Sequence, residues 1–385
     1  MSLLGQELRK IRRPGVLAGI ALLGLIYYYM FPSFYIEYFS NGPAAASSFT
    51  LSADWTARYG PTLEPEERRE LDGQLTEEKA RFIRQLQEIP EAGQAGVTDY
   101  ESFRAFSDRD ERDTQTIWTI LDHTNYDVIR QIEQVVERYD APPRYEYPGF
   151  ESVYTPKEQA RIIETEHQPY SLLPDTVMDS TNYYFKYLTQ WTAISVILLL
   201  SPTLVRDRLR RMRPFQWSTR RGRRVLHTQF AAGLLSGLAL SAGNLIVYMI
   251  PFLLQRPLVF RDCPLSHSVW AVGTPWFDWT YGQYLAVLSG MALSVGLGAG
   301  AVTLFLSQYS EHYVSMLLKA FPLFIVIGGF FAPWVMDNAF FFRPLWDYAE
   351  TDMFQGAEAF CIGALLTAGA ALMGWSLLRQ KQREC

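Results

Sequence analysis

Apolar residues gather in six long runs along the chain, separated by polar segments. The runs cover residues 15–36, 184–205, 230–254, 283–306, 314–336 and 357–378. A bilayer core of about 30 Å needs roughly 20 mostly apolar residues in helical form. The pattern therefore predicts a polytopic membrane protein with six transmembrane helices.

The long segment between the first two runs, residues 37–183, has a different pattern. Apolar residues recur there at spacings of three and four, most regularly over 110–139, which is the spacing of an amphipathic helix. We therefore expect a small α-helical domain with its own core, and an all-α fold for the whole chain.

Two helix starts in this segment read as capping boxes. In the first, Thr98 is followed three positions later by Glu101. In the second, Thr155 precedes Glu158, and Pro156 occupies the first helical position, where its missing N–H is harmless. Both patterns predict that a helix begins at the threonine.

Charge follows the same division of the chain. Residues 37–183 hold 29 acidic and 14 basic side chains, whereas the rest of the chain holds 11 acidic and 21 basic ones. Lys and Arg close to the ends of membrane helices mark the cytoplasmic side. They gather before the first run, between the second and third runs, and after the last. We therefore expect a multi-pass protein of the plasma membrane with both termini in the cytoplasm and residues 37–183 outside the cell.

These patterns divide the chain into seven parts. They are an interfacial cytoplasmic helix (1–14), a first transmembrane helix (15–36), an extracellular α-helical domain (37–183), a second transmembrane helix (184–205), a cytoplasmic basic loop (206–229), transmembrane helices three to six (230–378) and a cytoplasmic tail (379–385). A cleaved signal peptide is the alternative for the start of the chain, but its apolar region is usually shorter than this first run.

Small residues mark two of the apolar runs. Gly296 and Gly300 stand four positions apart in the fourth run, and Gly363 and Gly369 lie in the sixth. Small residues let membrane helices approach closely. The sequence therefore predicts helix packing at these four glycines.

Motifs of known catalytic or metal sites are missing from the sequence. It contains no HExxH, GxSxG or CxxC, and no GxxxxGK[ST] loop that would bind ATP. The acidic run at 108–113 is interrupted by Arg109 and Arg112 and lacks the glycine of a calcium loop. We therefore expect no catalytic residue, metal or cofactor in this chain.

Transport driven by an ion gradient is also poorly supported. Such transporters bury ionisable residues near the middle of the membrane, and the deep parts of all six runs carry none. Asn244 is the main polar residue left there, and we expect it to form a hydrogen bond between helices.

The basic loop carries nine arginines and one aspartate over residues 206–224. Topology alone calls for positive charge here, and anionic lipid headgroups would attract it, so nucleic-acid binding is the weaker interpretation. Residues 216–224, however, read "QWSTRRGRR". A loop that only sets topology needs positive charge but not Gln216, Trp217, Ser218 and Gly222 in this order. This part predicts a short helix or turn docked on a partner.

The segments "SPTLVRDR" and "QWSTRRGR" and the ending "LLRQKQREC" resemble the membrane subunits of ABC-type exporters. The similarity is to six-span subunits of Gram-positive bacteria with a large outer domain between the first two spans, although Trp217 stands where tyrosine is expected. The resemblance implies a coupling helix that docks on a separate ATPase, formed by Gln216, Trp217, Ser218, Thr219, Arg220, Arg221, Gly222, Arg223 and Arg224.

The resemblance also implies an assembly around this chain. Two membrane subunits, identical or different, would pair with a cytosolic ATPase dimer that holds ATP and Mg²⁺. Residues 336–356, which are rich in aromatics, would form either short outer helices or an interfacial aromatic belt. The expected function is export of a peptide or of an antimicrobial or lipophilic compound. The alternatives are a membrane sensor or energy transducer, whose extracellular domain binds a ligand or envelope protein, and a scaffold without energy coupling.

Overall fold

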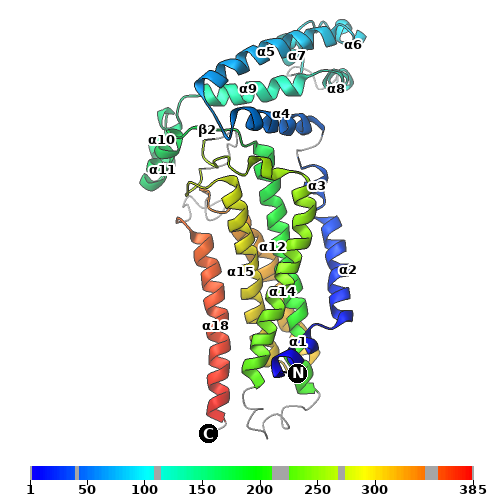
Figure 1. Cartoon of the computed structure of the whole chain (residues 1–385), viewed down its shortest axis with the longest axis vertical. Coiled ribbons are helices and arrows are strands. Elements are labelled where there is room, and N and C mark those ends of the chain that lie inside the picture. Colours follow the sequence, from blue (N-terminus) through cyan, green and yellow to red (C-terminus); the bar gives the residue numbers. More distant parts are fainter. Residues whose placement is uncertain are drawn as a thin grey trace. The chain divides into compact units, whose positions relative to one another are not determined.

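The computed structural model describes residues 2–39, 43–107, 114–209, 225–267, 274–342 and 354–383. The chain divides into two compact units. Unit 1 comprises Met1–Glu37, Asp179–Arg256 and Gln283–Cys385, and unit 2 comprises Tyr38–Met178 and Pro257–Gly282. Most of the described residues are helical (Figure 1).

Unit 1 is a bundle of long apolar helices. Its elements are α1 (Leu3–Ile11), α2 (Pro14–Met30), α3 (Phe34–Glu37), α12 (Asp175–Leu209), α14 (Val225–Leu254), α15 (Tyr281–Gln308), α16 (Tyr313–Leu323), the π-helical segment η5 (Phe324–Phe331), α17 (Ala332–Met336) and α18 (Ala357–Arg383). Helices α12 and α15 begin a few residues inside unit 2.

Five helical stretches among the described residues are long and apolar enough to cross a membrane. They are Asp175–Leu209, Val225–Leu254, Tyr281–Gln308, Tyr313–Met336 and Ala357–Gln380. A sixth span exists if α1 and α2, which meet at an angle of 45°, count as one. The chain is thus an all-α, multi-pass membrane protein with five or six candidate spans.

The first apolar run differs from its prediction. A continuous helix was expected over residues 15–36, but α2 ends at Met30 and a turn separates it from α3. Pro32 lies in that turn, and proline has no N–H to continue a helical ladder. By length alone, α2 therefore falls short of a full span.

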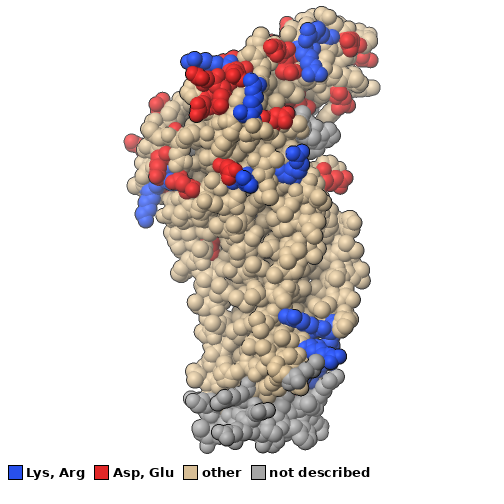
Figure 2. Space-filling view, viewed as in Figure 1, with Lys and Arg blue, Asp and Glu red and all other residues tan. Residues whose placement is uncertain are grey.

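Helices α12 and α15 form the centre of unit 1. In their most apolar windows 72% and 56% of the residues are buried, against 22% in α14, in α16–α17 and in α18. The outer helices leave large apolar side chains exposed, as membrane-facing helices do. On the face shown in Figure 2, the middle of unit 1 carries almost no charged side chain, and basic side chains gather at its α1 end.

Unit 2 is built from shorter helices. Its elements are α4 (Pro43–Tyr59), β1 (Thr62–Leu63), α5 (Pro65–Leu86), α6 (Pro90–Gln94), α7 (Tyr100–Ser107), α8 (Thr114–His123), α9 (Tyr126–Asp140), η2 (Arg144–Glu146), α10 (Phe150–Val153), α11 (Pro156–Glu166), β2 (Tyr170–Ser171) and η4 (Pro257–Phe260). The antiparallel pair β1–β2 has Thr62 opposite Ser171 and Leu63 opposite Tyr170.

Two hydrophobic clusters form the core of unit 2. One centres on Phe82, Phe103 and Ile120, and the other on Trp55 and Leu71, and α5 and α9 contribute to both. The described part of unit 2 therefore has the apolar core that the helical spacing predicted.

The helix predicted over residues 110–139 is broken in the structure. Residues 108–113 lie outside the described residues, and α8 and α9 are separate helices on either side of Asn125. The Asn125 backbone N–H donates to Gln85 Oε1 at 2.9 Å, and its side-chain amide donates to the Glu78 carbonyl at 2.9 Å. These contacts with α5 take Asn125 out of the helical ladder, which explains the break.

The two predicted capping boxes have different outcomes. The one at Thr155 is confirmed, because Glu158 Oε2 accepts from the Thr155 backbone N–H at 2.8 Å and Pro156 begins α11. The other is wrong by one residue. Asp99 Oδ1 accepts from the Ser102 N–H at 2.7 Å, and Ser102 Oγ accepts from the Asp99 N–H at 2.9 Å, so that aspartate and not the preceding threonine caps α7.

Candidate functional site

The nine residues of the predicted coupling helix, 216–224, lie outside the described residues. Helix α12 ends at Leu209 on one side of the arginine segment, and α14 begins at Val225 on the other. The structure therefore describes the two roots of this segment, defined here as residues 206–209 and 225–229.

A buried carboxylate joins the two roots to α1. Asp207 is 7% exposed, and its Oδ2 accepts from Gln229 Nε2 at 2.8 Å and from Lys10 Nζ at 3.3 Å. Lys10 also donates to Glu7 Oε1 at 2.6 Å, and Glu7 is 4% exposed. These four side chains, the root cluster, connect α1, α12 and α14 through buried or partly buried polar contacts.

Two arginines of the first root bind backbone carbonyls of other elements. Arg206 Nη2 donates to the Lys10 carbonyl at 2.8 Å. The guanidinium of Arg208 donates to the carbonyls of Ser310 at 3.0 Å and Gln308 at 2.6 Å, where α15 ends. Cationic side chains at a helix C-terminus satisfy its unpaired carbonyls and complement its dipole. The end of α12 is therefore fixed to α1 and to the end of α15.

Sequence reasoning missed the root cluster. Asp207 was visible as the one acidic residue among the arginines of 206–224, and Glu7 as the one acidic residue among the basic residues at the N-terminus. An isolated acid in a basic run is the signal that could have indicated a buried partner, but the pairing of Lys10 with Asp207 joins positions 197 apart.

Helix α12 contains a proline just before the first root. Pro202 has no N–H to donate to the preceding turn. Opposite it, the buried Ser307 of α15 donates to the Ser201 carbonyl at 2.8 Å and accepts from the Leu204 N–H at 3.1 Å. Ser307 therefore bonds directly to the α12 backbone at the position where a helix with an internal proline is weakest.

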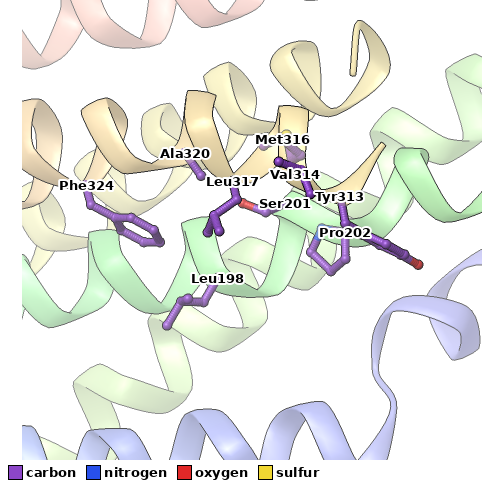
Figure 3. A pocket seen from close by; sticks show the side chains of 9 residues that line it. All are labelled: Leu198, Ser201, Pro202, Tyr313, Val314, Met316, Leu317, Ala320 and Phe324. Carbon is purple, nitrogen blue, oxygen red and sulfur yellow. The ribbon is translucent and has the colours of Figure 1, made fainter. Parts of the chain in front are cut away.

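A pocket of about 310 Å³ lies beside this proline, between α12 and α16 (Figure 3). Leu198, Ser201 and Pro202 of α12 line it, together with Tyr313 and Leu317 of α16 and other apolar residues. The Ser201 hydroxyl already donates to the Ile197 carbonyl at 2.6 Å. The pocket thus suits an apolar group and offers little to orient a polar ligand.

Two of the predicted packing glycines lie where α15 meets its neighbours. A Cβ added at Gly296 would stand 2.3 Å from Ser241 Oγ of α14, and one at Gly300 would stand 3.2 Å from Leu200 Cδ1 of α12. Because Cβ atoms in proteins essentially never come within 3.0 Å of such a neighbour, a side chain at position 296 would force the helices apart. Gly296 therefore permits the close contact between α14 and α15.

The other two predicted glycines, both in α18, differ from each other. A Cβ added at Gly369 would stand 2.6 Å from Ala301 Cβ of α15. A Cβ at Gly363 would meet nothing within 4 Å. Gly298 of α15, which was not among the predicted glycines, also lies close to α18. A Cβ added at Gly298 would stand 2.7 Å from Leu365 Cγ.

The expected hydrogen bond of Asn244 is confirmed. Its Nδ2 donates to Ser195 Oγ at 2.8 Å, which joins α14 to α12. A polar contact of this kind holds two membrane helices in register.

A second polar cluster joins the other ends of α12, α15 and α18. Asn182 Nδ2 donates to Asn338 Oδ1 at 2.9 Å, and the Tyr284 hydroxyl donates to Asn182 Oδ1 at 2.7 Å. The buried Glu358 accepts from the Phe340 N–H at 3.1 Å. Asn338 and Phe340 have φ of 47° and 65°, which is strained for a bulky residue such as phenylalanine. This cluster includes the described beginning of the stretch expected to form short outer helices or an aromatic belt; residues 343–353 of that stretch lie outside the described residues.

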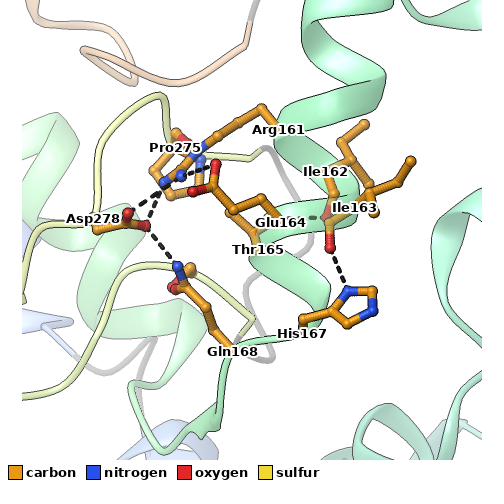
Figure 4. A network of polar contacts seen from close by, with 10 residues as sticks. Arg161, Ile162, Ile163, Glu164, Thr165, His167, Gln168, Pro275 and Asp278 are labelled. Atoms are coloured by element: carbon orange, nitrogen blue, oxygen red, sulfur yellow. Dashed lines mark hydrogen bonds and ion pairs between the residues drawn. The ribbon is translucent and has the colours of Figure 1, made fainter.

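In unit 2, Arg161 joins α11 to the segment between α14 and α15 (Figure 4). Its guanidinium donates from Nη2 to Asp278 Oδ1 at 2.6 Å, from Nε to the Pro275 carbonyl at 2.9 Å, and from Nη1 to Glu164 Oε2 at 2.8 Å. Gln168 Nε2 also donates to Asp278 Oδ1, at 2.7 Å. The hydrogen bond from Arg161 lowers the pKa of the Asp278 carboxyl below its usual value, and that from Gln168 adds to the effect.

The described residues offer no arrangement that would hold a metal ion, since no three or more His, Cys, Asp or Glu side chains among them are grouped for it. Their polar clusters consist of paired charges and hydrogen-bonded amides. Such clusters hold helices together.

Comparison of the chain with family models, curated proteins and solved structures finds no match. The function is therefore inferred from the residues described above and from the sequence of the arginine segment.

Proposed function

We propose that this protein is the membrane-spanning subunit of an ATP-driven exporter of the plasma membrane. Both termini would lie in the cytoplasm and unit 2 outside the cell. The chain has no P-loop, so a separate cytosolic ATPase dimer would bind ATP and Mg²⁺ and would dock on residues 216–224. Two membrane subunits would complete the assembly.

The root cluster is the structural observation that carries this proposal. A partner that displaces the arginine segment acts on both of its roots together, because Asp207 and Gln229 are bonded across it. Through Lys10 and Arg208 the same displacement reaches α1 and the end of α15. A buried charge is costly to separate from its partners, so these four helix ends move as one body. An energy-coupling segment requires such a rigid base.

The packing of α15 supports a motion inside the bundle. This helix meets α18 through small residues, because Gly369 of α18 faces Ala301 of α15. An interface of small residues permits α18 to slide along α15, and the described deep parts of the spans carry no ion pair that would oppose it. The predominantly apolar bundle fits a lipophilic compound or peptide better than a small ion.

The proposal is tested by co-purification from the native membrane. The triple variant Gln216→Ala/Gly222→Trp/Arg223→Glu changes the docking segment. The variant Met212→Ala/Arg213→Glu/Pro214→Trp makes comparable changes, with the same change in net charge, in the preceding part of the loop. We expect a P-loop ATPase to co-purify with wild type and with the second variant, and to be lost from the first. Absence of any ATPase from wild type contradicts the proposal.

A sensor or energy transducer is the second candidate, and one observation favours it. Arg161 binds Asp278 in the segment between α14 and α15, which belongs to unit 2. The first residues of α12 also belong to unit 2. A ligand that rearranges unit 2 would therefore act on the ends of three helices. An intact wild-type protein without ATPase, together with a ligand that protects α11 from hydrogen exchange, is the result that this candidate predicts.

A further inference from the structure

A second and larger cavity of unit 1, of about 560 Å³, lies between α2, α12 and α14. One wall comes from α2, between Leu17 and Tyr28, and the opposite wall from α14, between Leu240 and Pro251. Trp191 of α12 also lines the cavity. We call this cavity the α2–α14 groove.

The groove is elongated along the helices. Tyr28 lies eleven positions after Leu17, and Pro251 lies eleven positions after Leu240, so at 1.5 Å per residue each wall is about 16 Å long. Half of a hydrocarbon core of about 30 Å has nearly this length. The groove therefore matches one acyl chain in one leaflet of a bilayer.

The lining of the groove is also that of a hydrocarbon site. Leucine, isoleucine, valine, alanine and glycine make up most of it. Two of its polar groups are already engaged, since Asn244 donates to Ser195 at 2.8 Å and the Tyr248 hydroxyl donates to the Gly24 carbonyl at 3.2 Å. An apolar ligand would leave both of these hydrogen bonds in place.

Aromatic contacts hold the two walls at the far end of the groove. The rings of Tyr28 and Tyr248 meet edge to face at 5.5 Å, and Tyr27 stacks on Trp191 at 5.2 Å. Glycine at position 24 favours the close approach of α2 to Trp191, because an added Cβ would stand 3.0 Å from the indole ring. The position of α2 is thus set at both ends of the groove, by these aromatics and by α1.

Two arginines lie at the near end of the groove. Arg12 donates to Ser236 Oγ and to the Leu235 carbonyl, both at 3.4 Å, and Leu235 precedes Leu240 by about 7 Å along α14. Arg13 occupies the N-cap position of α2, one turn before Leu17, and its side chain makes no capping hydrogen bond. The Arg12 side chain is exposed, and a guanidinium carries five N–H donors, so donors remain for an anion. Positive charge therefore stands where a groove of acyl-chain length begins.

From this geometry we propose that the α2–α14 groove binds one anionic phospholipid, with an acyl chain along Leu17, Gly243 and Tyr28 and the phosphate at Arg12 and Arg13. Basic residues at the mouth of an apolar cleft between membrane helices recognise anionic headgroups in this way. The bound lipid would fill the space between α2 and the bundle. The proposal does not depend on export and stands if the ATPase partner is absent.

Native mass spectrometry of the full-length protein tests this site. The probes are palmitoyl-oleoyl phosphatidylglycerol and phosphatidylcholine, added in equal amounts to delipidated protein in detergent. Gly243→Phe fills the groove, since a Cβ at Gly243 meets nothing within 4 Å, and Gly290→Phe, equally unobstructed on α15 and not part of the lining, is its control. Arg12→Gln/Arg13→Gln removes the headgroup site, and Arg9→Gln/Arg379→Gln removes the same charge elsewhere.

We expect wild type to retain one phosphatidylglycerol in preference to phosphatidylcholine by roughly 5- to 30-fold, which is the effect of one to two arginines at about 1 kcal/mol each. Gly243→Phe should lose both lipids, and Arg12→Gln/Arg13→Gln should lose the preference alone. Should Gly243→Phe fail to fold, Gly243→Leu, which adds less volume, takes its place. Equal retention of the two lipids by wild type overturns the proposal, as does equal lipid retention by Gly243→Phe and Gly290→Phe.

Discussion

Asp207 and Gln229 are joined by a buried hydrogen bond of 2.8 Å that bridges the two ends of the arginine segment. The end of α12 and the beginning of α14 therefore form a single rigid base. The same carboxylate holds Lys10, so that the N-terminal helix belongs to this base as well.

Removing this carboxylate should destabilise the protein. We expect Asp207→Ala to lower the free energy of unfolding by about 2 to 3 kcal/mol, because Gln229 loses its buried acceptor and Lys10 loses one of its two carboxylate partners. Thermal unfolding in detergent measures the effect. Asp262→Ala is the control, since Asp262 pairs with Arg261 at the surface, where both side chains are about 70% exposed, and such pairs contribute little. Equal melting temperatures for the two variants would show that the root cluster is not a stabilising base.

The glycines of α15 and α18 should respond differently to the same small change. Gly296→Ala and Gly369→Ala place a Cβ at 2.3 Å and 2.6 Å from a neighbouring atom, and overpacking of this kind costs about 1 to 3 kcal/mol. Gly363→Ala meets nothing within 4 Å and should leave stability almost unchanged. Thermal unfolding of the three variants checks this order. Equal stability of Gly296→Ala and Gly363→Ala contradicts the close approach of α14 and α15.

The ion pair of Arg161 and Asp278 should make unit 2 sensitive to acid. The folded pKa of Asp278 is lowered, so its contribution to stability is complete above the unfolded value of about 3.9 and is lost as the pH falls through the folded pKa. Asp278→Asn should therefore weaken the hydrogen-exchange protection of α11 at neutral pH and match wild type at the acidic end of the titration.

Hydrogen exchange of the full-length protein, compared at each pH, measures this difference. Asp262→Asn lies in the same segment and serves as the control, because its partner Arg261 is exposed. A difference between wild type and Asp278→Asn that stays constant across the pH range would show that the pair does not act through its charge.

The sequence predicted those features that depend on neighbouring residues. The cap at Thr155 needs only Glu158 three positions later, and the apolar runs need only their own composition. The cap of α7 was missed because Thr98 and Asp99 are adjacent acceptors, and only the structure shows that Ser102 pairs with the second.

Features that depend on distant residues could not be predicted. The break at Asn125 is caused by α5, more than forty residues earlier, and the bond of Arg161 joins positions 117 apart. Gly363 and Gly369 are both glycines of α18, yet only Gly369 faces another helix closely. Whether a glycine permits close packing depends on the helix opposite it, which the local sequence does not show. Long-range pairing of this kind leaves no local signal.

The proposed orientation predicts which side of the membrane each unit reaches. Trp118 of α8 is 60% exposed, so we expect Trp118→Cys, in a Cys361→Ser/Cys385→Ser background, to react with a membrane-impermeant maleimide in intact cells. In a second variant, Cys361→Ser, Cys385 is kept. We expect Cys385 to react with the same maleimide only after the cells are broken. Labelling of Cys385 in intact cells contradicts a cytoplasmic C-terminus.

The most direct test of the exporter proposal is a photo-crosslink from the arginine segment in native membranes. A photoreactive phenylalanine analogue replaces Trp217, and in a control chain it replaces Trp375, which is half exposed on α18. We expect position 217 alone to capture a protein containing a P-loop. Capture of no ATPase from position 217, or equal capture from both positions, would contradict it.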